Sequence, residues 1–408
     1  MKTCLIGRTL KHSYSKIIHE SFGYEYDLVE TELEGLENLL KHSDYDCFNV
    51  TIPYKTEVIK YLDYLSETAK DVGAVNTIVK REGKLYGYNT DVFGMRYMMN
   101  YGGFKLKNKS VMILGSGGTS KTAEYVCNLL GAKNVVVVSR NGKVNYSNAS
   151  LIKPDYVINT TPVGMFPNQF ETPINLQEYK SVKGVIDVIY NPENTALTFS
   201  AKQMGLKAVN GLSMLVAQAK YSKDIFLGKE LTEDFKSPEI LRTIKKLSLT
   251  LGNIVLIGMP GSGKSAVGKY LSKITNKEFI DTDELTLEKT GKTPEEIIVN
   301  SGESAFRKIE SEILKELSLK RGIIVSTGGG AVTVPENEFY IKCASLVVCV
   351  KRKLKLLSTE NRPLTSTYKK IKSVYKKRKK FYKKFSHVTI NNEDIEETSK
   401  RILKLCEF

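Results

Sequence analysis

The segment GMPGSGKS at residues 258–265 constrains this chain more than any other feature of its sequence. It follows the apolar run 254–257 and precedes a segment in which apolar residues recur at helical spacing. A strand, a glycine-rich turn, a Lys-Ser pair and a helix in this order form a P-loop, whose backbone N–H groups surround a polyphosphate at the positive end of a helix dipole. We therefore predict a nucleotide site in which Lys264 reaches the phosphates and Ser265 binds Mg²⁺.

The length and composition predict several globular domains. With 408 residues the chain is long enough for two or three, and 41% apolar with 26% charged residues is typical of a globular protein. No apolar run approaches the ~20 residues that span a bilayer. The six cysteines are dispersed without a C-x-x-C pair, and the N-terminus reaches glycine and charge too early for a signal peptide. We expect a cytoplasmic protein with reduced thiols and no membrane partner.

The formal net charge of +16 raises the question of a nucleic-acid partner. The lysine excess is concentrated between Lys369 and Lys384, where aromatic and aliphatic residues recur at helical spacing. This pattern favours an amphipathic helix with a solvated lysine face, so we expect no nucleic acid to bind. The alternative is a nucleic-acid-binding protein that has kept inactive enzyme folds.

Strands and helices alternate over residues 1–100. We predict strands at 2–7 and 47–51, helices at 16–22 and 56–66, and a hairpin of 74–80 with 84–88. Polar side chains cluster where the strands end, and Lys55 and Asp91 lie among amides and hydroxyls there. A lysine and an aspartate in such surroundings suit an anionic, polyhydroxylated small molecule.

Residues 109–141 predict a βαβ unit. The strand 110–114 leads into a glycine-rich turn and a helix, and a second strand follows at 134–138. The turn is similar to a dinucleotide fingerprint, although Ser120 stands where a third glycine is usual. The second strand ends in Ser139 and Arg140 rather than in an acidic residue, and a guanidinium suits the 2′-phosphate of NADP. NADP is therefore the favoured cofactor.

A series of motifs then gives residues 1–248 a close resemblance to shikimate dehydrogenase. The motifs include Asn49-Val50-Thr51-x-Pro53-x-Lys55, Gly87-x-Asn89-Thr90-Asp91, Asn159-x-Thr161-Pro162-x-Gly164-Met165 and Gly211-x-x-Met214-Leu215-x-x-Gln218. The resemblance implies an α/β substrate lobe (1–100 with 211–248) and a Rossmann NADP lobe (101–210). It also implies that Lys55 and Asp91 are the acid/base pair for NADPH-dependent reduction of 3-dehydroshikimate.

The same resemblance implies two sets of binding residues. The residues that hold shikimate would be Ser13, Ser15, Thr51, Asn76, Asn89, Asp91, Tyr190 and Gln218. The residues that hold NADP would be Gly115, Ser116, Gly117, Gly118, Thr119, Ser139, Arg140, Val188 and Gly211.

Further motifs follow the P-loop. Residues 279–283 predict a short strand on which Asp281 and Asp283 share one face, one near Mg²⁺ and the other near a substrate hydroxyl. Arg307 and Glu310 are neighbours at i, i+3 on a predicted helix, so the carboxylate can orient the guanidinium for a bidentate grip on a substrate carboxylate. The strand 323–326 precedes three consecutive glycines, which let a ligand approach the backbone.

In this order, the motifs of residues 249–408 closely resemble those of shikimate kinase. The resemblance implies a P-loop domain with a parallel sheet, in which Asp283 serves as base or orienter for the attacking hydroxyl and Asp281 meets Mg²⁺ through water. The implied ATP-binding residues are Gly261, Ser262, Gly263, Lys264, Ser265, Ala266 and Arg362, and the implied shikimate-binding residues are Asp283, Arg307, Gly329 and Arg378.

Together the two resemblances predict a bifunctional enzyme that makes shikimate and then phosphorylates it, with NADP(H), ATP and Mg²⁺ as cofactors. A quinate/shikimate dehydrogenase fused to a small-molecule kinase is the nearer alternative. The sequence leaves the oligomeric state open, a homo-oligomer included.

Overall fold

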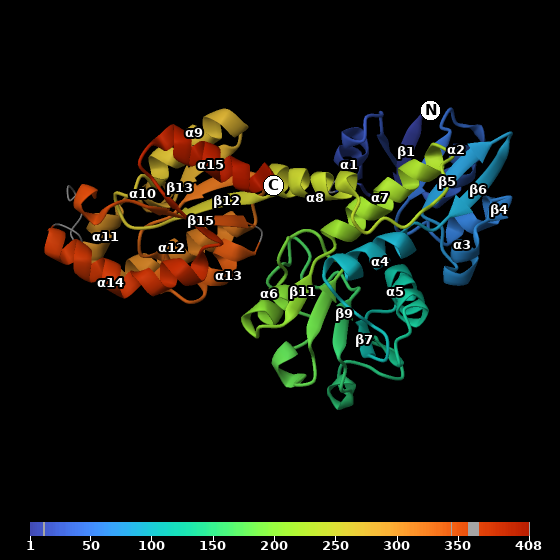
Figure 1. The fold of residues 1–408 in the computed structure, drawn as a ribbon, viewed down its shortest axis with the longest axis horizontal. Helices are drawn as coiled ribbons and strands as arrows, with labels where there is room; N and C mark the ends of the chain where they lie inside the picture. The colour runs from blue at the N-terminus through green and yellow to red at the C-terminus, as the bar shows by residue number, and fades with distance from the viewer. Residues whose placement is uncertain (11–12, 344, 358–366, 408) are drawn as a thin grey trace. The chain divides into compact units, whose positions relative to one another are not determined.

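The computed structural model describes residues 1–10, 13–343, 345–357 and 367–407. The chain divides into two compact units, 1–190 with 195–244 and 191–194 with 245–408. Figure 1 shows two sheets in the first unit and one in the second. All three sheets carry helices, which confirms the predicted α/β class.

The first sheet is mixed, and its strand order is β2-β1-β3-β5-β6-β4. Its strands are β1 (Thr3–Gly7), β2 (Asp27–Glu30), β3 (Cys47–Val50), β4 (Tyr64–Leu65), β5 (Thr77–Arg81) and β6 (Lys84–Tyr88). The predicted hairpin is present as β5 and β6, joined by Glu82 (φ 51°) and Gly83 (φ 76°). Two left-handed residues in a two-residue loop match the twist of the flanking strands.

The helices around this sheet are α1 (Ser15–Ser21), α2 (Leu36–His42), α3 (Glu67–Val72), α4 (Asp91–Tyr101) and α7 (Leu212–Phe226), with the 3₁₀ turns η1 (Leu33–Gly35) and η2 (Glu57–Tyr61). The predicted helix at 56–66 is wrong, because only η2 and β4 form there. Asp63 N donates to Leu85 O (3.0 Å) and Ser66 N donates to Gly87 O (2.9 Å), so pairing with β6 replaces the helical bonds.

The second sheet is parallel, with the order β11-β10-β9-β7-β8. Its strands are β7 (Ser110–Leu114), β8 (Asn134–Val138), β9 (Tyr156–Asn159), β10 (Gly184–Asp187) and β11 (Lys207–Val209). The accompanying helices are α5 (Gly118–Leu129), α6 (Ala196–Gln203), η3 (Ala149–Leu151) and η4 (Leu176–Glu178). The predicted βαβ unit is therefore present as β7, α5 and β8.

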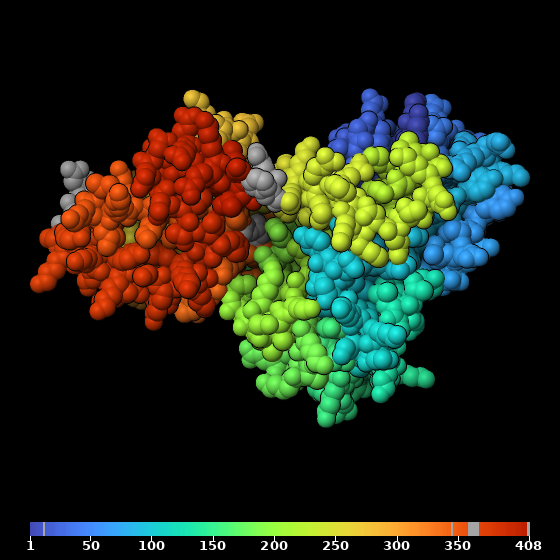
Figure 2. All heavy atoms as spheres, in the orientation of Figure 1, coloured from blue at the N-terminus to red at the C-terminus, as the bar shows by residue number. Residues whose placement is uncertain are grey.

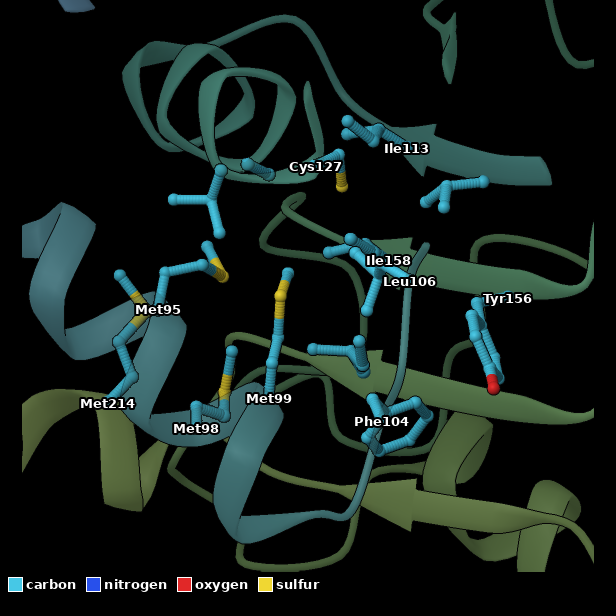
Figure 3. Close-up of a cluster of buried hydrophobic side chains, with 14 of the residues drawn as sticks. Met95, Met98, Met99, Phe104, Leu106, Ile113, Cys127, Tyr156, Ile158 and Met214 are labelled. Atoms are coloured by element: carbon cyan, nitrogen blue, oxygen red, sulfur yellow. The ribbon is translucent and has the colours of Figure 1, made fainter. Parts of the chain in front are cut away.

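Helix α4 packs against the second sheet of the first unit and against α7. Figure 3 shows Met95, Met98 and Met99 of α4 in one apolar cluster with Ile113 of β7 and Ile158 of β9. All five side chains are fully buried or nearly so. Because methionine is unbranched and adaptable, it fills the irregular space between a helix and a sheet. The packing fixes the position of the N-terminus of α4, where Asp91 lies.

The third sheet, in the second unit, is parallel, with the order β13-β14-β12-β15-β16. Its strands are β12 (Asn253–Ile257), β13 (Glu278–Asp281), β14 (Ile323–Ser326), β15 (Ser345–Lys351) and β16 (Val388–Asn391). Its helices are α9 (Lys264–Thr275), α10 (Thr282–Thr290), α11 (Pro294–Ser301), α12 (Glu303–Ser318), α13 (Asn337–Lys342), α14 (Tyr368–Phe385) and α15 (Ile395–Glu407), with η5 (Ala331–Thr333) and η6 (Leu354–Leu356). Helix α8 (Pro238–Leu251) begins in the first unit and ends in the second. The predicted strand, P-loop and helix are β12, residues 258–263 and α9.

The lysine-rich segment forms α14, as predicted. The helix buries Ile371, Arg378, Tyr382 and Phe385, and its lysines are exposed. In Figure 2 the visible surface of the second unit consists largely of residues from the C-terminal part of the chain, coloured orange to red. Within the residues that the structure describes, no helix is both long and apolar enough to cross a membrane.

His19 links the stability of the first unit to pH. Its ring is fully buried, stacks on Tyr26 at 4.0 Å between centroids, and pairs through Nδ1 with the hydroxyl of Tyr24. Burial lowers the pKa of His19 to about 3. A histidine in the unfolded chain binds a proton below about pH 6.5. The folded form therefore binds fewer protons in this interval, and stability should fall as the pH drops from about 6.5 towards 3.

We predict that His19→Phe reduces the loss of stability between pH 7.5 and pH 5, because the substituted ring no longer titrates. Denaturant unfolding at both pH values would measure the loss. His42→Phe is the matched control, since His42 is exposed. An unchanged pH dependence in His19→Phe would contradict the prediction.

Candidate active sites

Lys55 and Asp91 form an ion pair in the first unit. Lys55 follows β3, Asp91 is the first residue of α4, and Lys55 Nζ donates to Asp91 Oδ2 at 2.6 Å. The side chains are only 23% and 12% exposed, so the pair is not an ordinary solvated surface contact. The second carboxylate oxygen of Asp91 accepts from Asn76 Nδ2 at 3.0 Å. The carboxylate therefore holds the ammonium group at a defined place.

A layer of buried amides and hydroxyls supports this pair. Asn76 Oδ1 accepts from Thr90 N at 2.7 Å, and Asn49 Nδ2 donates to the carbonyl of Asn76 at 3.1 Å. Asn49 also donates to Ser222 Oγ (2.9 Å) and accepts from the Tyr26 hydroxyl (2.7 Å). A satisfied buried network of this kind is rigid. Sequence reasoning missed Tyr26 and Ser222, which lie outside the motifs.

The ion pair lines a cavity of about 410 Å³. The structure brings these predicted substrate and cofactor residues to its wall: Ser13, Ser15, Thr51, Lys55, Asn76, Asp91, Thr119, Val188, Tyr190, Gly211 and Gln218. Asn89 is not among them, because its side chain donates to Ala74 O (2.9 Å) and accepts from Val92 N (3.3 Å). In this structure Asn89 orders the backbone before α4.

The turn between β7 and α5 fits a dinucleotide. Gly115 has φ +106°, and a Cβ at Gly117 or Gly118 would meet no atom within 4 Å, so the backbone is open to a ligand. No side chain caps the N-terminus of α5, so the positive end of the helix dipole is available to a phosphate. Ser116 belongs to this turn, Ser139 follows β8, and the adjacent Arg140 is exposed. These features suit the pyrophosphate and 2′-phosphate of NADP.

Gly211 has a separate steric role on the cavity wall. A Cβ at this position would lie 1.9 Å from the carbonyl oxygen of Val188. Glycine therefore lets the start of α7 approach the end of β10, where Val188 follows Asp187.

A second cavity, of about 420 Å³, is lined in part by the P-loop. Its wall includes ten predicted residues: Gly261, Gly263, Lys264, Ser265, Ala266, Asp281, Asp283, Arg307, Gly329 and Arg378. Lys264 Nζ donates to the carbonyls of Gly258 (3.2 Å) and Met259 (3.1 Å). Ser262 is fully buried and lies outside the wall, and Arg362 lies outside the described residues.

Ser265 and Asp281 offer oxygen ligands beside the P-loop. Ser265 Oγ donates to Asp281 Oδ2 at 2.6 Å. Mg²⁺ needs only one or two protein oxygens when substrate phosphates and water complete its shell, so the two side chains fit this ion. No group of three or more His, Cys, Asp or Glu side chains suited to a metal occurs among the described residues.

The expectation that Asp281 and Asp283 share a strand face is wrong. Strand β13 ends at Asp281, and Asp283 lies in the first turn of α10. Asp281 caps this helix, since its Oδ1 accepts from Asp283 N at 3.0 Å. Both residues nevertheless line the cavity. An Asp followed by helix-forming residues was the N-cap signal in the sequence.

Arg307 and Glu310 form a buried ion pair on α12, 2.6 Å apart, with side chains 12% and 0% exposed. Burial raises the pKa of Glu310, and the neighbouring Arg307 opposes that shift. Two of the three glycines, Gly328 and Gly330, leave room for this pair. A Cβ at Gly330 would lie 1.9 Å from Arg307 Nη2, and one at Gly328 would lie 2.2 Å from Glu310 Oε1.

Two further residues, missed in the sequence, hold the arginines and the glycine turn after β14. Glu303 Oε1 accepts from Arg307 Nη2 at 2.9 Å and lies 3.7 Å from Arg378 Nη2. Tyr382 donates its hydroxyl to the carbonyl of Gly329 at 2.6 Å. The i, i+4 spacing of Glu303 and Arg307 was the available sequence signal for the first contact.

We predict that Gly330→Ala destabilises the second unit by about 2–4 kcal/mol, because the new methyl group displaces Arg307 and leaves Glu310 buried without its partner. The backbone itself tolerates alanine, since Gly330 has φ −103°. Urea unfolding would measure the effect. In an Arg307→Ala background the cost of Gly330→Ala should largely disappear. An equal cost in both backgrounds would show that the clash with Arg307 is not the cause.

Two family models match the chain. The model described as the shikimate dehydrogenase substrate binding domain matches residues 5–78, and the model described as shikimate kinase matches residues 260–407.

Relatives match the N-terminal part of the chain. The shikimate dehydrogenase (NADP(+)) of Clostridium beijerinckii is 37% identical over 258 residues, which cover 57% of this chain and 96% of the relative. The enzyme of the same name from Caldicellulosiruptor bescii is 38% identical over 250 residues, 53% of this chain and 86% of the relative.

Solved structures of shikimate dehydrogenases are also similar to this chain. Shikimate dehydrogenase 1 from Peptoclostridium difficile has a TM-score of 0.56 at 34% identity and covers 60% of this chain and 98% of its own. The shikimate 5-dehydrogenase from Thermus thermophilus, solved in complex with NADP(H) and shikimate, has a TM-score of 0.53 at 27% identity and covers 60% of this chain and 99% of its own. The chain therefore belongs to the shikimate dehydrogenase family and continues into a shikimate kinase domain, as a bifunctional enzyme of the shikimate pathway.

Proposed function

We propose that the first cavity reduces 3-dehydroshikimate to shikimate with NADPH and that the second transfers the γ-phosphoryl group of MgATP to shikimate. The observation that carries this proposal is the ion pair of Lys55 and Asp91 in one cavity with Thr119, which lies in the first turn of the helix after the dinucleotide turn. The names of the relatives support shikimate rather than quinate as the alcohol.

NADPH supplies the hydride for the first reaction. Lys55 donates a hydrogen bond to the ring ketone oxygen and passes a proton to it as negative charge develops there. Asp91 keeps the ammonium group in place, and the network through Asn76 keeps Asp91 in place. In the reverse direction Lys55 accepts the proton from the hydroxyl.

The remaining polar residues of the first cavity bind the substrate. Ser13 and Ser15 suit the carboxylate, because a hydroxyl donates without bringing a charge that competes with Lys55. Thr51, Tyr190 and Gln218 line the same wall and suit the ring hydroxyls. Asn89 acts indirectly, by ordering the backbone that carries Asp91.

MgATP supplies the phosphoryl group for the second reaction. Asp283 orients the attacking hydroxyl of shikimate, and Arg307 and Arg378 bind its carboxylate. Lys264 leaves the carbonyls of Gly258 and Met259 to stabilise charge on the transferring group, a role to which we also assign Arg362. Ser265 and Asp281, which lie beside each other, would hold the Mg²⁺ ion that accompanies the nucleotide.

We further propose three domains: a substrate lobe (1–100 with 211–248), an NADP lobe (101–210) and a kinase domain (249–408). Location in the cytoplasm is supported by five buried free cysteines among the described residues. The partners would be small molecules rather than nucleic acid, because the lysines of α14 form the solvent face of an amphipathic helix.

We predict that Lys55→Ala lowers the dehydrogenase kcat by about 10²-fold or more and leaves the kinase kcat within twofold, because general acid–base catalysis is lost only in the first cavity. Lys264→Ala should lower the kinase kcat by about 10²–10³-fold and spare the dehydrogenase. NADP⁺-linked absorbance with shikimate and a coupled assay of ADP release would measure the two rates.

Lys60→Ala and Lys273→Ala are the matched controls, since both lysines are exposed on helical turns of the same units. If Lys55→Ala or Lys264→Ala silenced both reactions in folded protein, the assignment of one lysine to each reaction would be wrong.

A further inference from the structure

Asn392 lies beneath the P-loop, in the connection between β16 and α15. It is 6% exposed, and its Nδ2 donates to the carbonyl oxygen of Ser262 at 2.8 Å. Its Oδ1 accepts from Thr398 Oγ1 at 3.2 Å. A buried amide whose donor and acceptor are both engaged with separate elements has one orientation, with the NH₂ group towards the P-loop.

The backbone of the P-loop is shaped around this amide. Gly263 has φ +91°, and a Cβ at this position would lie 2.2 Å from Asn392 Nδ2. Only glycine therefore combines the left-handed conformation with such a close approach. The amide and the P-loop peptide behave as one packed unit.

The hydrogen bond to Ser262 also sets the direction of the next N–H group. In a trans peptide the C=O and the following N–H point in opposite directions. Because the Ser262 carbonyl points to Asn392, the Gly263 N–H points away from Asn392. Gly263 lines the second cavity, where phosphate oxygens would accept from this N–H group.

Asn392 is itself held by the sheet and by α15. Its backbone N–H donates to Lys351 O at 2.7 Å, next to the paired residues Lys351 and Asn391 of β15 and β16. Thr398, which donates to the amide oxygen, is 2% exposed on α15. The edge of the sheet thus supports the P-loop through one side chain.

We propose that Asn392 is a positioning residue of the nucleotide site, which presents the Gly263 N–H to the nucleotide phosphates by holding the Ser262 carbonyl. It acts through the P-loop and does not touch the substrate. The proposal rests on the proposed kinase function for the identity of the nucleotide.

The test uses Asn392→Asp and Asn392→Ala in the full-length protein. Aspartate has nearly the shape of asparagine, but its carboxylate cannot donate to the Ser262 carbonyl and repels it. Alanine removes the donor without adding charge. Calorimetry should show the Kd of MgADP raised about tenfold for Asn392→Asp and about fivefold for Asn392→Ala, the range that one net hydrogen bond supports.

Three readouts separate positioning from general damage. The KM for MgATP should rise in parallel with the Kd of MgADP, while the KM for shikimate and the dehydrogenase rate stay within twofold. Asn391→Asp is the matched control, because it adds the same charge one residue away at an exposed position. It should leave the Kd of MgADP within twofold.

The proposal is overturned if both Asn392 variants bind MgADP like the unsubstituted protein, if Asn391→Asp weakens binding equally, or if the KM for shikimate rises as much as that for MgATP. Absence of MgADP binding to the unsubstituted protein would instead remove the kinase function on which the proposal rests. The two failures are therefore distinguishable.

Discussion

A charged side chain leaves water only when hydrogen bonds and opposite charges replace its hydration, and both active sites depend on that replacement. In the first unit Asp91 stays beside Lys55 because Asn76, itself bonded to the buried layer around Asn49, occupies its other oxygen. In the second unit the side chain of Glu310 is fully buried, and Arg307 balances its charge through a direct ion pair. Each site thus contains a pair of opposite charges that is held largely away from water.

The packing around these pairs explains features that carry no chemistry of their own. The methionines of α4 fill the space against the second sheet, and they thereby fix the helix end that bears Asp91. Because residues 328 and 330 are glycines, no Cβ atom occupies the space in which the Arg307–Glu310 pair lies. Their role is therefore steric accommodation of protein side chains, in addition to the backbone access for a ligand that the sequence suggested.

The sequence predicted best where local patterns decide the structure. The strand, turn and helix of the P-loop, the βαβ unit and the amphipathic α14 are local patterns, and all are present. Segment 56–66 was wrong because pairing with β6 is non-local. Asp283 was misplaced because Asp281 caps α10, so the helix begins at Thr282, within the predicted strand. Tyr26, Ser222 and Asn392 could not be found, since their partners lie far away in the chain.

The central claim is that the product of the first site is the substrate of the second. Its most direct test is one reaction of the full chain with 3-dehydroshikimate, NADPH and MgATP, in which NADPH oxidation, free shikimate and shikimate 3-phosphate are measured over time. We expect equal final amounts of NADPH oxidised and shikimate 3-phosphate formed, after a transient of free shikimate. Oxidation of NADPH with no phosphorylated product, even after shikimate is added, would contradict the account.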